Sequence, residues 1–441
     1  MNPTSLIGHV LELSELIEKN TQPADRITNQ FFRERKYLGS HDRRFISEAI
    51  FCMLRHRRHV ETMLENFIAS YPSASELNNS HRKLLPLYVI YVAVFDQISP
   101  IQQSVESYWK TSFPKIDFTQ FVQWIQEHKS LDSIAADEIT RLGVKYSFQD
   151  WMVREWREQL GEETEALLQA FNTPAPTTLR VNLLKTTREE CQKRLDAEGI
   201  ETSPTRFSPA GLAARKRFNI QSSQAFKDGL FEVQDEGSQI VSLLAAPKPG
   251  DVVIDACAGA GGKSLHMSEM MKNEGEIIAV DVEETRLLKL RERAKRAGVQ
   301  CVKTFHLDKL HPKNLFGKAD LVLIDAPCSG VGTIRRNPGL KWSIMELLVS
   351  HYSEKQKDLL EYNSKFVKTG GRLVYATCSL FRRENEYVIQ GFLSAHPHFA
   401  SLKPTEIMES LGLTSEGDFV KLFPHSHGTD GFFVAVLKRV G

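Results

Sequence analysis

The chain has 441 residues, of which 41% are hydrophobic and 25% are charged, and its formal net charge is +1. The length allows two or three domains, and the composition is typical of globular proteins rather than disordered or fibrous ones. Because the net charge is close to zero, attraction of nucleic acid by bulk charge is excluded, and any such binding must come from local basic patches.

The sequence shows no pattern of a membrane span, an export signal or a metal centre. Its longest apolar run, residues 84–95, is well short of the roughly 20 residues that cross a bilayer and predicts a buried helix. The start of the chain lacks the basic and apolar regions of a secretory signal. The six cysteines form no CxxC pair, which argues against zinc ligation and against a disulfide framework. We expect a cytoplasmic, monomeric protein with reduced thiols and no metal.

The N-terminal part has the apolar spacing of helices. Up to about residue 142 apolar residues recur at helical intervals, for example in residues 45–54, and no alternating strand pattern appears. A further helical pattern covers residues 147–168, and an extended segment follows at 178–182. We predict an all-α domain over residues 1–142 and a small mixed α/β connecting region over residues 143–240. Basic residues cluster at Arg33, Arg35 and Lys36, at Arg43 and Arg44, at Arg55, Arg57 and Arg58, at Arg215, Lys216 and Arg217, and at Arg335 and Arg336.

From residue 247 onward, apolar strands alternate with helices. The predicted strands are residues 251–255, 277–281, 301–306, 321–325 and 372–376, with a helix over 284–297 and a last strand over 432–437. Nearly continuous apolar strands separated by helices are typical of a mostly parallel sheet that is covered on both faces. The predicted fold class is therefore α/β, with a doubly wound, Rossmann-like domain over residues 241–441.

A glycine-rich turn follows the first of these strands and predicts a ligand site. Residues 257–263 read Cys-Ala-Gly-Ala-Gly-Gly-Lys, and the glycines let backbone amides approach a ligand closely. A phosphate-binding loop would need its first glycine at the position of Cys257. The spacing of Gly259, Gly261 and Gly262 does not fit a dinucleotide fingerprint either.

Two aspartates that follow strands favour an adenosyl ligand without phosphates. Asp281 ends the second strand, where a carboxylate can bind both hydroxyls of a ribose. Asp308 follows the third strand, at a position from which a carboxylate would contact an adenine.

Two cysteines follow the fourth and fifth strands in polar loops. Cys328 lies in Asp-Ala-Pro-Cys-Ser-Gly and Cys378 in Thr-Cys-Ser, and the carboxyl ends of parallel strands face one cleft. Carbon 5 of a pyrimidine becomes a nucleophile only after a group adds to carbon 6, and a thiolate is the strongest such group in a protein. A second group must then help to remove the proton from carbon 5. Two cysteines meet these needs, and the residues alone do not decide which one attacks.

Other functions fit these residues less well. A methyltransferase that modifies an exocyclic amine would carry an aromatic side chain where Cys328 stands. A non-catalytic RNA-binding assembly factor could keep the fold without the chemistry, but both cysteines and the glycine-rich turn are intact.

Motifs in every part of the chain resemble one family. They are residues 31–36 and 38–43 in the helical part, 179–182 and 233–239 in the connecting region, the cofactor turn, both cysteine motifs, and 423–425 with 428–433. With these motifs the chain resembles the Sun/Fmu-type (RsmB-like) RNA cytosine-5 methyltransferases, bacterial enzymes that modify small-subunit ribosomal RNA. Its first two motifs resemble a NusB-type RNA-binding module, and the resemblance covers nearly the whole length.

The resemblance implies a cofactor, a partner and residue roles. It implies S-adenosylmethionine as cofactor, RNA as partner, RNA binding by residues 1–142 and 143–240, attack by Cys378, and release assisted by Cys328. The implied cofactor residues are Cys257, Ala258, Gly259, Ala260, Gly261, Gly262, Lys263, Asp281, Asp308 and Asp325, of which Lys263 and Asp325 would also contact the target base. The family turn usually reads Cys-Ala-Ala-Pro-Gly-Gly-Lys, so Gly259 and Ala260 are departures. Without the proline we expect a looser turn and a lower cofactor affinity.

Overall fold

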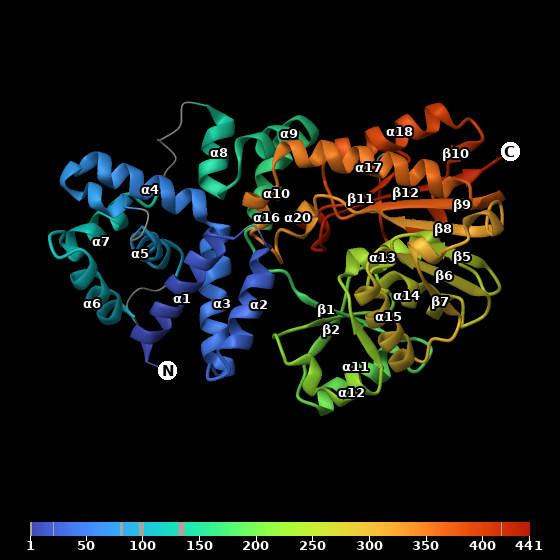
Figure 1. The fold of residues 1–441 in the computed structure, drawn as a ribbon, viewed down its shortest axis with the longest axis horizontal. Helices are drawn as coiled ribbons and strands as arrows, with labels where there is room; N and C mark the ends of the chain where they lie inside the picture. Colours follow the sequence, from blue (N-terminus) through green and yellow to red (C-terminus); the bar gives the residue numbers. More distant parts are fainter. Residues whose placement is uncertain (1, 21, 80–82, 97–100, 131–136, 416) are drawn as a thin grey trace. The chain divides into compact units, whose positions relative to one another are not determined.

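The computed structural model describes residues 2–20, 22–79, 83–96, 101–130, 137–415 and 417–441. The chain forms two compact units, shown in Figure 1. Unit 1 comprises Met1–Thr173 and Ile334–Met345, and unit 2 comprises Pro174–Thr333 and Glu346–Gly441. Among the described residues, no helix is long and apolar enough to cross a membrane.

All secondary-structure elements in the described part of unit 1 are helices. Its α-helices are α1 (Pro3–Glu18), α2 (Ala24–Glu34), α3 (Ser40–Arg55), α4 (Arg57–Ser70), α5 (Leu84–Phe95), α6 (Gln102–Ser112), α7 (Phe118–Glu127), α8 (Glu138–Tyr146), α9 (Asp150–Leu160), α10 (Thr164–Phe171) and α16 (Leu340–Ser343), with 3₁₀ turns η1 (Pro72–Asn78) and η2 (Gly161–Glu163). The first helix begins where the sequence favours it, because the side chain of Asn2 accepts the N–H of Ser5 and Pro3 occupies the first turn. The apolar α5 is buried among its neighbours, as predicted.

A small antiparallel sheet begins unit 2. Its strands are β1 (Thr177–Val181), β2 (Thr202–Pro204), β3 (Gly211–Ala214) and β4 (Phe231–Val233), in the order β2-β3-β1-β4. The helices α11 (Arg188–Ala197) and α12 (Gln224–Lys227) and the turn η3 (Ile220–Ser222) accompany it. Its own apolar core includes Leu179, Leu195, Leu212 and Phe231.

The large sheet of unit 2 has the order β10-β12-β9-β8-β5-β6-β7, and β11 pairs with β12. The strands are β5 (Val252–Asp255), β6 (Glu276–Asp281), β7 (Val302–His306), β8 (Ala319–Asp325), β9 (Val367–Thr377), β10 (Phe399–Ser401), β11 (Val420–Leu422) and β12 (Phe432–Arg439). Strands β5 to β9 pair in parallel, whereas β12 runs antiparallel to β9.

Helices cover both faces of this sheet. The α-helices are α13 (Glu236–Ala245), α14 (Gly262–Met270), α15 (Glu284–Ala297), α17 (Glu346–Ser364), α18 (Glu386–Ala395), α19 (Thr405–Ser410) and α20 (Pro424–His427), and the 3₁₀ turns are η4 (Leu307–Lys309), η5 (Pro312–Asn314), η6 (Val331–Thr333) and η7 (Arg382–Glu384). Side chains of α13, α14 and α19 share one apolar core with the sheet, and those of α17 and α18 share the other (Figure 1). The predicted α/β class, with a helical N-terminal region and a Rossmann-like sheet, is confirmed.

The predicted strands all occur, and the largest difference from their predicted bounds is at β9. The strand expected at 372–376 begins at Val367, where the pairing with β8 shifts register and Gly370 adopts a φ of +78°. This irregular start is polar and was therefore not recognised as strand. Strands β10 and β11 were not predicted either, because three residues are too short for a periodic pattern.

Candidate active site

The two cysteine loops lie side by side at the carboxyl edge of the large sheet. Strands β8 and β9 are parallel neighbours, and Asp325 pairs with Ala376 at the end of their register. The loops that follow bring the Sγ atoms of Cys328 and Cys378 to 3.5 Å from each other. Both side chains are partly exposed. The structure therefore brings together the two cysteines that the sequence analysis singled out.

A buried carboxylate joins these loops. Glu384, in η7, accepts the backbone N–H of Ser329 at 2.7 Å and the hydroxyl of Ser329 at 2.6 Å. It also accepts the hydroxyl of Ser379 at 2.5 Å. These serines directly follow Cys328 and Cys378, so one side chain fixes the position of both loops. Burial raises the pKa of Glu384, and the hydrogen bonds from the serines oppose that rise.

Glu384 is a site residue that the sequence motifs do not indicate. It lies in Phe-Arg-Arg-Glu-Asn-Glu, a charged stretch with the composition of a solvated loop. Its proximity to the Thr-Cys-Ser motif was the only available signal, and no spacing rule distinguishes it from Glu386.

A lysine–aspartate pair lies next to the thiols. The Nζ of Lys263 donates to Oδ2 of Asp325 at 2.5 Å and lies 5.5 Å from the ring centroid of Phe432. Burial acts to lower the pKa of Lys263, but the negative charge and the hydrogen bond of Asp325 outweigh it and raise that pKa. Lys263 is therefore a cation, and it interacts electrostatically with Cys378.

The cofactor turn has a backbone that its glycines allow. Gly259 and Gly261 have φ values of +54° and +82°, where other residues are strained. A Cβ at Gly261 would lie 2.4 Å from Cγ of Leu290, whereas nothing lies within 4 Å of a Cβ at Gly259. The N–H of Gly259 donates to Oδ2 of Asp281 at 2.8 Å, so the turn and this carboxylate are adjacent. The turn closes internally, since Gly261 donates to the carbonyl of Ala258 at 2.8 Å.

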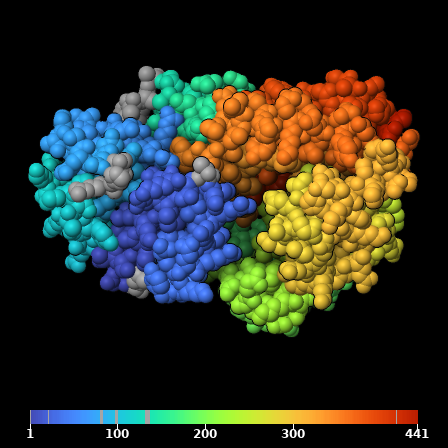
Figure 2. All heavy atoms as spheres, in the orientation of Figure 1, coloured from blue at the N-terminus to red at the C-terminus, as the bar shows by residue number. Residues whose placement is uncertain are grey.

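The surroundings of the turn fit S-adenosylmethionine. Val282 and Leu307 leave apolar side chains 64% and 42% exposed beside the carboxylates of Asp281 and Asp308. His306 donates through Nε2 to the carbonyl of Val282 at 2.9 Å, which joins the ends of β6 and β7. An adenosine needs carboxylates for its hydroxyls and an apolar surface for its ring, and this edge offers both. Figure 2 shows that the surface is hollowed between the α14–α15 segment, in yellow, and the α17 segment, in orange.

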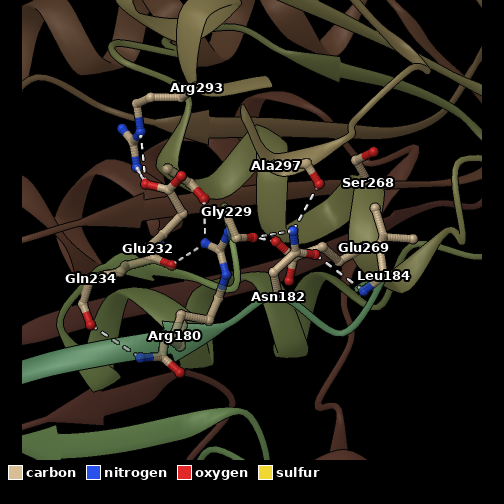
Figure 3. A network of polar contacts seen from close by, with 12 residues as sticks. Arg180, Asn182, Leu184, Gly229, Glu232, Gln234, Ser268, Glu269, Arg293 and Ala297 are labelled. Carbon is tan, nitrogen blue, oxygen red and sulfur yellow. Dashed lines mark hydrogen bonds and ion pairs between the residues drawn. The ribbon is translucent and has the colours of Figure 1, made fainter. Parts of the chain in front are cut away.

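Two arginines fix the outer side of the turn. Arg180, fully buried on β1, donates to the carbonyl of Gly262 at 2.7 Å and to Glu269 of α14 at 2.8 Å. The Oε1 of Gln234 also accepts from Arg180, and Figure 3 shows this group from close by. The motif at residues 179–182 therefore joins the small sheet to α14 and to the cofactor turn.

The second arginine acts at the position where the family's proline is missing. Arg293 of α15 donates to the carbonyl of Ala260 at 2.7 Å. Its guanidinium is paired with Glu232 of β4 at 3.0 Å, as Figure 3 shows. A charge-assisted hydrogen bond thus restrains the turn at Ala260.

The basic clusters differ in exposure. Arg55 is buried and donates to the carbonyl of Arg335 at 3.3 Å, and Arg58 donates to the carbonyl of Phe148 at 2.6 Å, so both stabilise unit 1 from within. Exposed basic side chains are Arg33, Lys36, Arg44, Arg215, Lys216, Arg217 and Arg336.

Comparison with known proteins supports a methyltransferase. Residues 242–438 match the family model described as 16S rRNA methyltransferase RsmB/F, and residues 148–221 match the ferredoxin-like domain of RsmF/B-like methyltransferases. The chain is 31% identical over 415 residues to the probable ribosomal RNA small subunit methyltransferase B of Synechocystis sp., which covers 91% of this chain and 92% of the relative. The protein of the same name from Bacillus subtilis is 29% identical over 452 residues, with full coverage of both chains. The crystal structure of PH0851 is 28% identical, covers 99% of each chain and has a TM-score of 0.77.

Proposed function

Because the chain belongs to the RsmB/F family of 16S ribosomal RNA methyltransferases, which use S-adenosylmethionine, we propose that it methylates carbon 5 of a cytosine in small-subunit ribosomal RNA. The observation that carries this proposal is the pair of thiols, Cys328 and Cys378, 3.5 Å apart beside the Lys263 ammonium. Methylation of an exocyclic amine needs no thiol, whereas methylation of carbon 5 needs a nucleophile that adds to carbon 6.

Cys378 begins the reaction as a thiolate. It forms a bond to carbon 6 of the cytosine, and the electrons of the ring double bond make carbon 5 a nucleophile. S-adenosylmethionine supplies an electrophilic methyl group on its sulfonium when it is bound. After transfer, the proton on carbon 5 passes to water with the assistance of Cys328, the double bond forms again, and the bond between sulfur and carbon 6 breaks.

The electrostatics favour this division of roles. The hydrogen bond to Cys378, together with burial, raises the pKa of Cys328 well above its ordinary value. Cys328 therefore stays a neutral thiol. A neutral thiol in contact with the nucleophile is suited to assist its release rather than to attack.

The remaining site residues have binding roles in this proposal. Residues 257–263, Asp281 and Asp308 would hold the cofactor, with Asp281 on the ribose hydroxyls and Asp308 near the adenine. Asp325 and Lys263 would contact both the cofactor and the target base. Residues 1–142, as a NusB-like domain, and residues 143–240 would bind RNA outside the catalytic domain at 241–441.

The test is methylation of small-subunit ribosomal RNA from cells that lack the gene. We expect incubation with S-adenosylmethionine to increase the mass of one RNA fragment by a methyl group, and bisulfite sequencing to find one newly protected cytosine. The Cys378→Ala variant serves as the inactive control. A methyl group on an amine would contradict the carbon 5 assignment, and no mass change with intact RNA binding would favour a non-catalytic assembly factor.

A further inference from the structure

A pocket of about 250 Å³ lies in unit 2, outside the cofactor turn and the cysteine loops. Its walls come from the small sheet, from the start of α13 and from the end of α20. They are apolar at two prolines and an alanine, and polar at Thr178, Thr205, Arg206, His427 and Thr429. The volume is below the roughly 300–1,000 Å³ of sites for drug-sized ligands and suits a single flat ring.

The pocket offers hydrogen-bond donors. The guanidinium of Arg206 lies 4.8 Å from the ring centroid of Phe207 and donates to the carbonyl of Ser426 at 3.4 Å. That bond uses one of its five N–H groups. Nδ1 of His427 accepts the N–H of Phe423 at 3.0 Å, and burial lowers the pKa of His427. The imidazole is therefore neutral, with its proton on Nε2 as a donor.

The two carboxylates at the pocket are stabilised by backbone amides. Asp235 accepts the N–H of Gly237 at 2.8 Å and that of Asp430 at 3.1 Å. Glu236 accepts the N–H of Phe207 at 2.6 Å and that of Ser208 at 2.7 Å. Amide donors disperse these charges, so the pocket is not built for a cation.

Backbone hydrogen bonds connect the pocket wall to the loop that contains Cys378. Two residues beyond Thr429, the N–H of Gly431 donates to the carbonyl of Gly332 at 2.9 Å. The N–H of Gly332 in turn donates to the carbonyl of Cys378 at 2.8 Å. These segments touch closely, since a Cβ at Gly332 would lie 2.1 Å from the carbonyl oxygen of Gly431. The segment that ends the pocket wall is therefore joined to the Cys378 loop by two backbone hydrogen bonds.

We propose that this pocket binds the base of a nucleotide that flanks the target cytosine in single-stranded RNA, an inference that rests on the proposed function. Proteins read single-stranded RNA by taking individual unstacked bases into pockets with polar and apolar walls. An enzyme that acts on a base must also draw it out of the stack, which leaves the neighbouring base in need of a binding site. The donors suit the ring nitrogen and carbonyl acceptors of a base, and exposed Arg206 suits its phosphate.

The test uses short single-stranded RNAs centred on the methylated cytosine, each with one abasic position. For the wild-type protein we expect one flanking position at which loss of the base lowers kcat/KM by about tenfold, the scale of one bound base. Ala213→Leu, which narrows the pocket, and Arg206→Ala should lower kcat/KM on intact RNA by a similar factor. On that abasic RNA the two variants should have the same kcat/KM as the wild type, because the contact between pocket and base is already missing.

Lys248→Ala is the matched control, because Lys248 is an exposed cation before the amino end of β5 and does not line the pocket. It should keep the full wild-type response, and all variants should bind S-adenosylmethionine like the wild type. If a pocket variant lowers kcat/KM on the abasic RNA by the same factor as on intact RNA, this inference is overturned. The proposed function would remain intact. If no RNA is methylated, the proposed function fails, and RNA binding across the same abasic series still decides whether the pocket holds a base.

Discussion

At the scale of single residues, we predict opposite effects on the covalent adduct for Cys378→Ala and Cys328→Ala. Cys378→Ala should form neither adduct nor product, because in the proposed mechanism only the Cys378 thiolate adds to carbon 6. Cys328→Ala should attack and transfer the methyl group but release slowly, so that protein stays covalently attached to methylated RNA. Denaturing electrophoresis with labelled RNA and S-adenosylmethionine distinguishes the two.

Cys301→Ala is the control for these variants, since Cys301 is buried in an apolar core and should tolerate the change. A trapped complex from Cys378→Ala and none from Cys328→Ala would reverse the roles of the two thiols. Normal turnover in both would remove the covalent mechanism.

Glu384 should affect chemistry without affecting cofactor binding. In Glu384→Gln one acceptor oxygen becomes an amide donor that faces hydroxyl groups, so the loops after Cys328 and Cys378 lose their common anchor. We expect kcat to fall at least about tenfold, which corresponds to about 1.4 kcal/mol in the barrier, with unchanged affinity for S-adenosylmethionine. Glu386→Gln, which breaks an ion pair with Lys421 on β11, is the matched control. Equal losses of activity in both variants would speak against the positioning role.

Ionisation of Asp255 should make the free energy of unfolding depend on pH. Burial raises its pKa from 3.8 to about 6, against the hydrogen bond from Ser264. Between these values the folded state keeps a proton that the unfolded state has lost, so the free energy of unfolding falls as pH rises through this window. The total fall is about 3 kcal/mol, and it is nearly complete at pH 7.

Asp255→Asn should remove this fall and be more stable than the wild type near pH 7. Urea denaturation of both proteins from pH 4 to pH 7 measures the difference, in which the contributions of other carboxylates cancel. Parallel stability curves for the two proteins would show that Asp255 ionises equally in both states.

At the scale of elements, two glycines of the cofactor turn, Gly259 and Gly261, should differ in their tolerance of substitution, although the sequence does not distinguish them. Gly261→Ala combines a left-handed φ with a Cβ 2.4 Å from Leu290, so the turn or α15 must move. We expect binding of S-adenosylmethionine to be lost. Gly259→Ala has open space and should lose only about 1–2 kcal/mol of stability from its φ of +54°. Calorimetric titration and thermal unfolding compare them, and equal effects would contradict the steric argument.

The elements that sequence predicted well are those with local signals. The helix over 284–297 ends at Gly298, which adopts φ +75°, and its bounds were predicted to the residue. The apolar strands and the meeting of Cys328 with Cys378 followed from the alternation of strand and helix. In contrast, Arg180 on β1 gave no signal of burial, because its partner Glu269 lies 89 residues away. Pairing over such distances depends on tertiary structure, which local patterns do not contain.

At the scale of the whole molecule, the boundary between the units is not a single cut in the chain. Residues 334–345 follow the Cys328 loop but belong to unit 1. There Lys341 is fully buried and donates to the carbonyl of Arg55 at 2.9 Å and to Oδ1 of Asn172 at 2.5 Å. Burial and the charge of Arg55 lower the pKa of Lys341 well below its ordinary value. Removal of residues 1–142 would delete Arg55 and leave Lys341 without one of its acceptors, so a truncation would test folding as well as RNA binding.

Surface substitutions test RNA binding by unit 1 without this complication. Since the net charge is only +1, affinity for RNA must depend on exposed patches. Simultaneous change of Arg33, Lys36 and Arg44 to Gln removes three exposed cations from the helical unit. Each phosphate contact contributes about 0.7 to the slope of log affinity against log salt for single strands, so the slope should become shallower by about 2 if all three contact phosphate.

The matched control is the change of Lys357, Lys365 and Lys368 to Gln. These lysines are exposed, and the last lies at the amino end of β9, whereas Cys378 follows its carboxyl end. Fluorescence titration of labelled RNA at several salt concentrations should show weaker binding and a shallower slope for the first triple variant alone, with unchanged affinity for S-adenosylmethionine in both. If the two variants lose affinity equally, long-range charge rather than contact by unit 1 accounts for RNA binding. If neither loses affinity, the helical unit has a role other than RNA binding, and the connecting region with its exposed Arg215 to Arg217 becomes the next surface to change.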